Sequence, residues 1–125
     1  MDGTKAIRLG ELSRKLGFGT VNLTLYCKCF RGGVPICWPS FGPWSEGPQH
    51  GFARSSVWSV DEEARTETSV TLELGDSELW PGQKFKLRYK VSLAEDNSLE
   101  LELSATNCSE DKELSFTSAL HTYFR

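Results

Sequence analysis

The sequence contains two histidines, His50 and His121. Histidine is the side chain that titrates nearest to neutral pH, so two of them brought together could act as general acid and base on a bound molecule. A lone histidine on a strand is more often structural, and the residues alone leave both interpretations open. A metal site is not favoured, because no further histidine and no cluster of carboxylates completes a ligand set.

Two arginines, Arg31 and Arg54, flank a stretch rich in glycine, proline and aromatic residues. A guanidinium group binds phosphate or carboxylate through paired hydrogen bonds, so two arginines in one concave site would suit an anionic ligand. Trp38 and Trp44 lie in the same stretch and could offer ring faces to a sugar, although packing in the core is the favoured interpretation of both. A long irregular segment with several rigid aromatics is typical of a packed, functional loop.

The elements that must position these residues are predicted to be strands. The chain has 125 residues and a mass of 14.0 kDa, which suits one domain. Alternation of apolar and polar residues predicts strands over 20–30, 57–60, 68–74, 85–93, 99–105 and 114–124. A weak helical pattern covers 5–17, and Glu95-Asp96-Asn97-Ser98 indicates a turn. Strands separated by short turns favour an antiparallel all-β fold.

Two of these strands should share an apolar face and a charged face. We expect the residues on the apolar face to point into a common core: Phe85, Leu87, Tyr89, Leu99, Leu101 and Leu103. The opposite faces carry lysine and arginine on 85–93 and glutamate on 99–105, so cross-strand pairing of these charges is predicted.

Composition limits the possible functions. The net charge is −3, with +4 in residues 1–60 and −7 in residues 61–125, which disfavours a nucleic-acid binder with a continuous basic face. Mean hydropathy is −0.37 and no apolar run is long enough to span a bilayer. The first 18 residues lack the apolar core of a signal peptide, so we expect a cytoplasmic protein. The four cysteines fit no common zinc spacing and are expected to be free thiols: Cys27, Cys29, Cys37 and Cys108.

Several separated motifs, in order, resemble one enzyme family. They are RGGVPICWP at 31–39, FG at 41–42, QHGFAR at 49–54, LWP at 79–81 and SFTSALHTYF at 115–124. Together they make residues 31–125 similar to the hexose-6-phosphate mutarotases, or glucose-6-phosphate 1-epimerases, which are relatives of aldose 1-epimerase.

This resemblance implies a fold, a reaction and a set of site residues. The fold would be a large antiparallel β-sandwich of the galactose mutarotase type. The reaction would interconvert the α and β anomers of a hexose 6-phosphate by opening and reclosing the ring, without a cofactor. His121 matches the general acid at the ring oxygen, and Arg31, Gln49 and Arg54 match substrate-binding positions. His50 would help to line the pocket.

The sequence departs from the family in two ways. Residues 1–30 do not resemble it, so the chain divides into 1–30 and a matching part, 31–125. Family members are also more than twice as long, and their general-base glutamate and a substrate-binding aspartate lie in the part not matched. We therefore expect an incomplete β-sandwich that is inactive alone. The alternatives are a non-catalytic carbohydrate-binding module and a truncated chain without a stable fold. The sequence gives no prediction of the oligomeric state.

Overall fold

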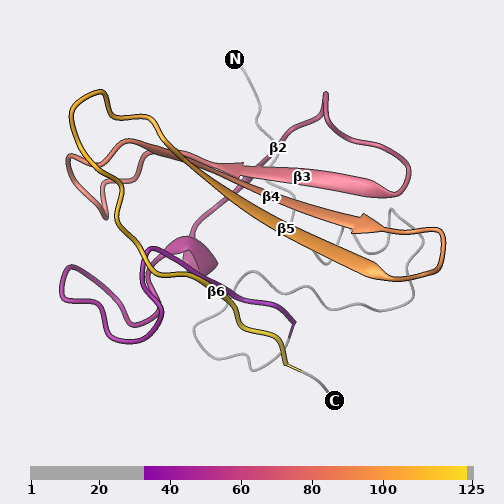
Figure 1. The fold of residues 1–125 in the computed structure, drawn as a ribbon, viewed down its shortest axis with the longest axis horizontal. Helices are drawn as coiled ribbons and strands as arrows, with labels where there is room; N and C mark the ends of the chain where they lie inside the picture. The colour runs from indigo at the N-terminus through magenta and orange to yellow at the C-terminus, as the bar shows by residue number, and fades with distance from the viewer. Residues whose placement is uncertain (1–32, 124–125) are drawn as a thin grey trace. The chain divides into compact units, whose positions relative to one another are not determined.

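The computed structural model describes residues 33–123, which form two compact units. One unit comprises residues 57–114 and the other comprises residues 33–56 with 115–123. Every strand pair is antiparallel, which confirms the predicted all-β antiparallel class (Figure 1). The expected helix at 5–17, the strand at 20–30, the segment 1–30, Cys27, Cys29 and Arg31 lie outside the described residues. No helix among residues 33–123 is long and apolar enough to cross a membrane.

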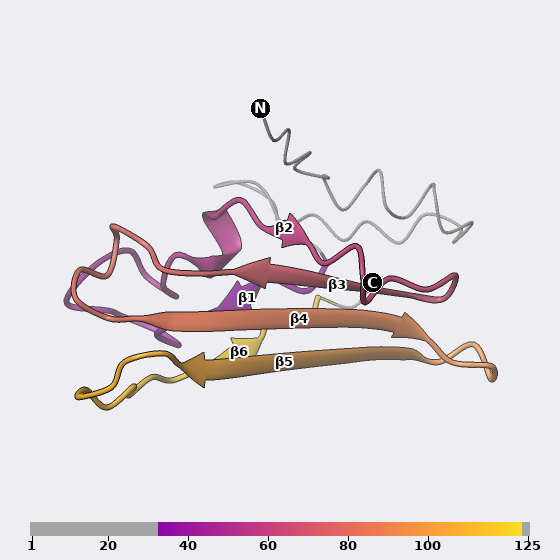
Figure 2. The same cartoon turned by 90° about the horizontal axis from the view of Figure 1, so that it is seen from above.

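The unit formed by residues 57–114 is a four-stranded sheet. Its strands, in the spatial order β2-β3-β4-β5, are β2 (Ser59–Val60), β3 (Ser69–Leu74), β4 (Phe85–Leu93) and β5 (Leu99–Asn107). Figure 2 shows β3, β4 and β5 running in alternating directions. The turn between β4 and β5 is where the sequence predicts it: the Asp96 carboxylate accepts the Ser98 N–H at 2.8 Å, and Asn97 adopts a positive φ of 65°.

The core of this unit lies under β3 and β4. Apolar residues alternate along β4, and Phe85, Leu87 and Tyr89 are fully buried. Tyr89 faces Leu72 of β3 on one side and Leu103 of β5 on the other, so one face of the sheet is apolar across three strands. The period-two pattern therefore predicted the face of β4 correctly.

The prediction for β5 is only partly correct. In the register, Leu99, Leu101 and Leu103 lie opposite Leu93, Val91 and Tyr89, so they share the apolar face. Leu99, however, is 43% exposed, and the other two leucines are half-buried. Within the described sheet β5 has a neighbour on one side only, and an edge strand leaves its apolar face less covered than a central strand does.

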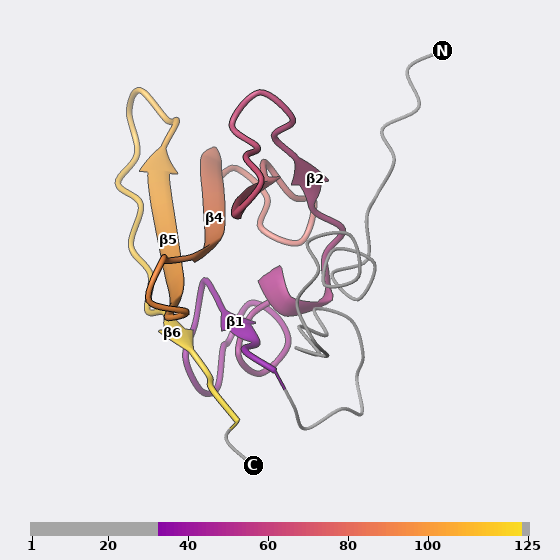
Figure 3. The ribbon, with the colours of Figure 1, turned by 90° about the vertical axis from the view of Figure 1, so that its right-hand side faces the viewer.

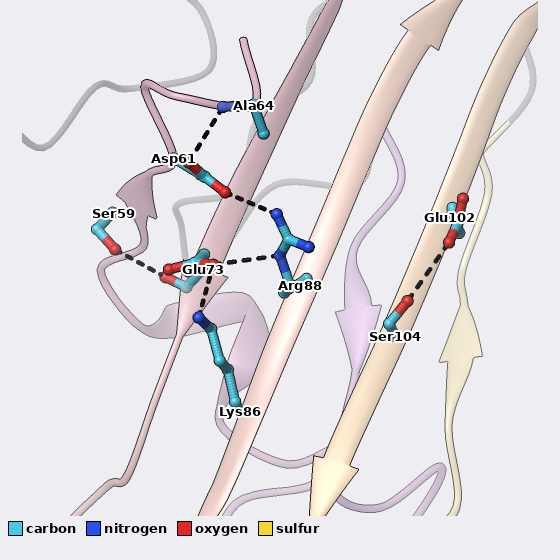
Figure 4. Close-up of polar contacts among 8 residues, drawn as sticks. All are labelled: Ser59, Asp61, Ala64, Glu73, Lys86, Arg88, Glu102 and Ser104. Carbon is cyan, nitrogen blue, oxygen red and sulfur yellow. Dashed lines mark hydrogen bonds and ion pairs between the residues drawn. The ribbon is translucent and has the colours of Figure 1, made fainter.

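The sequence predicts that lysine and arginine of β4 pair with the glutamates of β5. For Lys86 and Arg88, whose ion pairs the structure shows, this prediction is wrong. Figure 4 shows both contacting Glu73 of β3 instead: Lys86 at 2.8 Å and the Nε of Arg88 at 3.2 Å. Arg88 also reaches Asp61 at 2.6 Å. The register explains the difference, because Arg88 lies opposite Glu73 on β3 but opposite Ser104 on β5.

Asp61 gives a prediction about pH and stability. The Ala64 N–H donates to its carboxylate at 3.2 Å, and this bond, with the Arg88 contact, holds the pKa of Asp61 below its ordinary value. A carboxyl with a lowered folded-state pKa stabilises the fold above its ordinary pKa, and this contribution is lost as pH falls through the lowered pKa. In urea unfolding, Asp61→Asn should therefore cost stability at pH 6 and much less at pH 2.5. An equal cost at both pH values would contradict this role.

The second unit is built on two short strands. β1 (Ile36–Cys37) pairs with β6 (Ala119–Leu120), and a 3₁₀ turn, η1 (Ala53–Ser55), contacts β1 (Figure 3). The strand predicted over 114–124 is thus limited to two residues. The predicted strand at 57–60 is likewise limited to Ser59–Val60. In both segments the alternating pattern extends beyond the ladder of backbone hydrogen bonds that defines the strand.

Candidate functional site

The second unit carries the four predicted site residues that the structure describes, and its glycine-rich loop is organised around Trp38. This residue is fully buried, and its carbonyl accepts the N–H groups of Phe52 and Ala53 at 3.0 and 3.2 Å. Its own N–H donates to the carbonyl of His50 at 3.2 Å. The ring of Trp38 packs edge-on against Phe52. Trp38 is therefore a core residue and does not offer its face to a sugar, whereas Trp44 is half-buried beside Phe52.

His50 is fixed by its backbone and by its ring. It has a φ of 67°, and its N–H donates to the Gly42 carbonyl at 2.8 Å. The N–H of Gly42 in turn donates to Nδ1 of His50 at 3.0 Å. A ring nitrogen that accepts a hydrogen bond is unprotonated, so the proton of the neutral ring is on Nε2. His50 therefore presents an Nε2–H donor.

The surroundings of His50 favour its neutral form. Burial lowers its pKa below the ordinary value, and the positive charge of Arg54 and the neighbouring His121 lower it further. Protonation at Nδ1 would also break the hydrogen bond from Gly42. The ring is consequently suited to donating a hydrogen bond near neutral pH and poorly suited to supplying a proton.

His121 follows β6 directly and is half-buried. Its N–H donates to the Pro35 carbonyl at 2.9 Å, which continues the alignment of the two strands. The centres of the His121 and His50 rings are 6.1 Å apart, and the Tyr123 ring lies 4.7 Å from His121 on the same segment. Nδ1 of His121 is buried and has no hydrogen-bond partner among the described residues. The antiparallel pairing thus brings together two histidines that are 71 positions apart.

Arg54 and Gln49 are joined at the base of the same loop. Arg54 lies in η1, where its Nη2 donates to the Gln49 carbonyl at 2.7 Å. The guanidinium has five N–H donors, and this bond uses one of them. Its charge lowers the pKa of His50 and opposes the rise that burial imposes on the pKa of the Cys37 thiol. Arg54 therefore acts electrostatically on His50 and has donors left for an anion.

The structure thus brings Gln49, His50, Arg54 and His121 into one unit. Sequence reasoning did not assign Phe41 or Tyr123 a role at this site, although both rings contact its histidines. The only sequence feature that could have indicated a role for these two residues is their position within the motifs at 41–42 and 115–124. Cys37 and Cys108 are both free thiols, as predicted. Among residues 33–123 no group of three or more metal-binding side chains is found.

We expect the pKa of His50 to depend measurably on Arg54. Arg54→Gln removes a positive charge beside His50 and should raise the pKa of His50 toward its ordinary value, because one of the effects that lower it is lost. Arg65→Gln is a matched control, since Arg65 belongs to the other unit and pairs with Glu62. NMR titration of the histidine ring signals measures both variants. An unchanged pKa of His50 in Arg54→Gln would contradict the arrangement.

Comparison with known proteins decides the family. The aldose 1-epimerase family matches residues 19–125 of this chain. The chain belongs to the aldose 1-epimerase family. The matched range contains the motifs that carry the site and begins at residue 19, so it also includes part of the segment 1–30, in which the sequence shows no motif of the family.

Curated relatives of this family member agree with the match. Proteins named "Putative glucose-6-phosphate 1-epimerase" are 37% identical over 109 residues in Cenchrus ciliaris and 42% identical over 103 residues in Salmonella typhimurium. These alignments cover 78% and 75% of this chain but 33% and 32% of the relatives. This member of the aldose 1-epimerase family therefore spans about a third of the length of the curated relatives it matches.

A solved structure supports the fold of the family member. The crystal structure named as a putative mutarotase from Salmonella typhimurium is 37% identical, with a TM-score of 0.52. The superposition covers 62% of this chain and 28% of that one. The antiparallel strands of residues 33–123 are consistent with part of a galactose mutarotase-like β-sandwich.

Proposed function

We propose that the complete protein to which these residues contribute is a hexose-6-phosphate 1-epimerase. The observation that carries the proposal is the pairing of β1 with β6, which sets the His121 ring 6.1 Å from the His50 ring beside Arg54. Family membership and the names of the relatives support a sugar phosphate as substrate. A phosphorylated sugar also supports the cytoplasmic location expected from the sequence.

In the proposed reaction His121 is the general acid. It protonates the ring oxygen while a general base removes the proton of the anomeric hydroxyl, and the ring opens to the aldehyde. Rotation about the C1–C2 bond and the reverse proton transfers close the ring as the other anomer. His121 suits the acid role better than His50, whose Nδ1 is occupied by the Gly42 N–H and whose pKa is lowered.

The remaining residues bind the substrate. The free donors of Arg54, together with Arg31, are proposed to bind the phosphate, since a guanidinium forms paired hydrogen bonds with phosphate oxygens. Gln49 holds Arg54 through its carbonyl, and its side chain is proposed to bind a hydroxyl of the sugar. His50 is proposed to donate its Nε2–H to the substrate. No residue of this chain matches the glutamate of the family that serves as base, so we propose that residues 1–125 alone are inactive.

The experiment uses a fusion in which this chain replaces the matching third of the Salmonella typhimurium relative. Exchange NMR on α-glucose 6-phosphate should show rapid conversion to the β anomer by the fusion. A fusion that folds, binds glucose 6-phosphate and does not interconvert its anomers would favour the alternative function, a non-catalytic carbohydrate-binding module. A fusion that folds and does not bind the sugar phosphate would contradict both functions.

A further inference from the structure

Four aromatic rings contact one another in series across the candidate site. The centres of Phe41 and His50 are 5.5 Å apart, those of His50 and His121 are 6.1 Å apart, and those of His121 and Tyr123 are 4.7 Å apart. We call these four residues the aromatic row. The two histidines lie in its middle, so Phe41 and Tyr123 flank the groups to which the proposed chemistry is assigned.

The outer rings of the row are exposed. Phe41 is 54% exposed and Tyr123 is 39% exposed, whereas the neighbouring Trp38 and Phe52 are fully buried. The unit therefore buries some of its aromatic side chains completely and leaves these two in solvent beside polar, titratable rings. Small-molecule sites commonly have this composition, with apolar and aromatic surface interrupted by a few polar groups.

Both ends of the row are held by hydrogen bonds. The N–H of Phe41 donates to the Thr117 hydroxyl at 2.8 Å, and the N–H of Thr117 donates to the Pro39 carbonyl at 3.0 Å. At the other end the N–H of Tyr123 donates to the Gly33 carbonyl at 3.1 Å. The backbone thus fixes where the side chains of Phe41 and Tyr123 begin. Because these segments are already ordered, binding a ligand there costs the protein little conformational entropy.

We propose that the two outer rings of the aromatic row, Phe41 and Tyr123, pack on the apolar face of a pyranose ring and act as substrate-positioning residues. The inference rests on the proposed function and adds the part of the site that recognises the sugar ring. In β-glucose the hydroxyls are equatorial, so one face presents only the axial hydrogens of C1, C3 and C5. Such a face packs on aromatic rings, while the hydroxyls at its edge remain free to meet histidine and arginine donors.

The experiment measures binding of glucose 6-phosphate and, separately, of inorganic phosphate to the full 125-residue chain by NMR titration. Phe41→Leu and Tyr123→Leu should each weaken glucose 6-phosphate binding about threefold to tenfold, because each removes one ring contact. Binding of inorganic phosphate, which has no ring, should stay unchanged. Tyr123→Phe keeps the ring and should bind like the original chain.

Phe116→Leu is the matched control. Phe116 belongs to the same unit and is 41% exposed, but its ring lies 5.8 Å from Trp38 and is not part of the row. This variant should bind both ligands normally. In the original chain the axial ring protons of bound glucose 6-phosphate should move upfield, and this shift should shrink in Phe41→Leu.

The outcomes separate this inference from the proposed function. Normal glucose 6-phosphate binding by Phe41→Leu and Tyr123→Leu would overturn the aromatic row and leave the proposed function intact. Equal weakening of both ligands would also overturn it, since that indicates a general disturbance of the unit. No binding of glucose 6-phosphate by the original chain would overturn the row as well. Anomer exchange by the fusion tests the proposed function independently.

Discussion

His121→Ala is expected to lower the rate of anomer exchange by about 10²–10⁴-fold in the fusion with the Salmonella typhimurium relative. A positioned general acid contributes a factor of this size, and His121 is the histidine whose Nδ1 is not used by any described residue. Thr122→Ala is the matched control, because Thr122 is the exposed next residue and has no assigned role in the reaction. Exchange NMR on α-glucose 6-phosphate measures the rate of anomer exchange for the unchanged fusion and for its two variants. A fusion that retains its full rate without His121 would contradict the assignment of the acid.

The 125-residue chain without the fused part should leave the spontaneous exchange rate unchanged. Ring opening requires a proton to be removed at one oxygen and delivered at another, and this chain supplies a matched group for delivery only. Catalysis by the isolated chain that disappears in His121→Ala would show this wrong. A carboxylate on the exposed part of the loop, such as Glu46, would then be the candidate base.

The sequence was most informative where one physical constraint dominates. Along 85–93 the period-two pattern specifies both the strand and its buried face, because a register shift of one residue would expose Tyr89 and bury Arg88. The turn at 95–98 was equally clear from its polar residues. Family resemblance identified the loop residues and the histidine after β6 that the structure brings into one unit, whereas Arg31 lies outside the described residues.

The sequence was less informative where tertiary neighbours decide which charges pair and which side chains are buried. The cations of β4 had acidic neighbours available on two strands. The register places Glu73 opposite Arg88, and the ion pairs of the folded structure show that Lys86 contacts the same carboxylate. The burial of Leu99 depends on whether β5 has a second neighbour, which alternation does not encode. The roles of Trp38 and Phe41 were hard to separate for a similar reason. Both are aromatics in one loop, and only tertiary packing buries the first and exposes the second.

Gly51→Ala should strongly destabilise the second unit. Gly51 has a φ of 72°, and a Cβ there would overlap the backbone carbonyl group of Trp38 and lie 2.6 Å from the nitrogen of Pro39. A left-handed conformation costs a residue with a Cβ about 1–2 kcal/mol, and overpacking costs about 1–3 kcal/mol more. We expect a loss of about 2–5 kcal/mol in the free energy of unfolding.

Two further glycines separate these contributions. Gly42 has a φ of 98° with nothing within 4 Å of its added Cβ, so Gly42→Ala should cost only the conformational part, about 1–2 kcal/mol. Gly75 has neither a positive φ nor a neighbour within 4 Å, and Gly75→Ala should leave stability unchanged or raise it by about 0.4–1 kcal/mol. Urea unfolding of the three variants should give the order Gly51, Gly42, Gly75. Equal losses for Gly51→Ala and Gly42→Ala would show that close packing against Trp38 contributes nothing.

Gly51→Ala should also affect the candidate site, because Trp38, which the new methyl group would meet, also holds His50. The His50 carbonyl accepts the Trp38 N–H, and the Phe52 and Ala53 N–H groups bond to the Trp38 carbonyl that the new methyl group would meet. Displacing Trp38 therefore displaces His50 on one side of residue 51 and Arg54 on the other. We expect the ring signals of His50 to shift in Gly51→Ala under conditions where the variant is still folded, and to stay in place in Gly75→Ala. A folded Gly51→Ala variant with unshifted His50 signals would show that the loop and the site are independent of this contact.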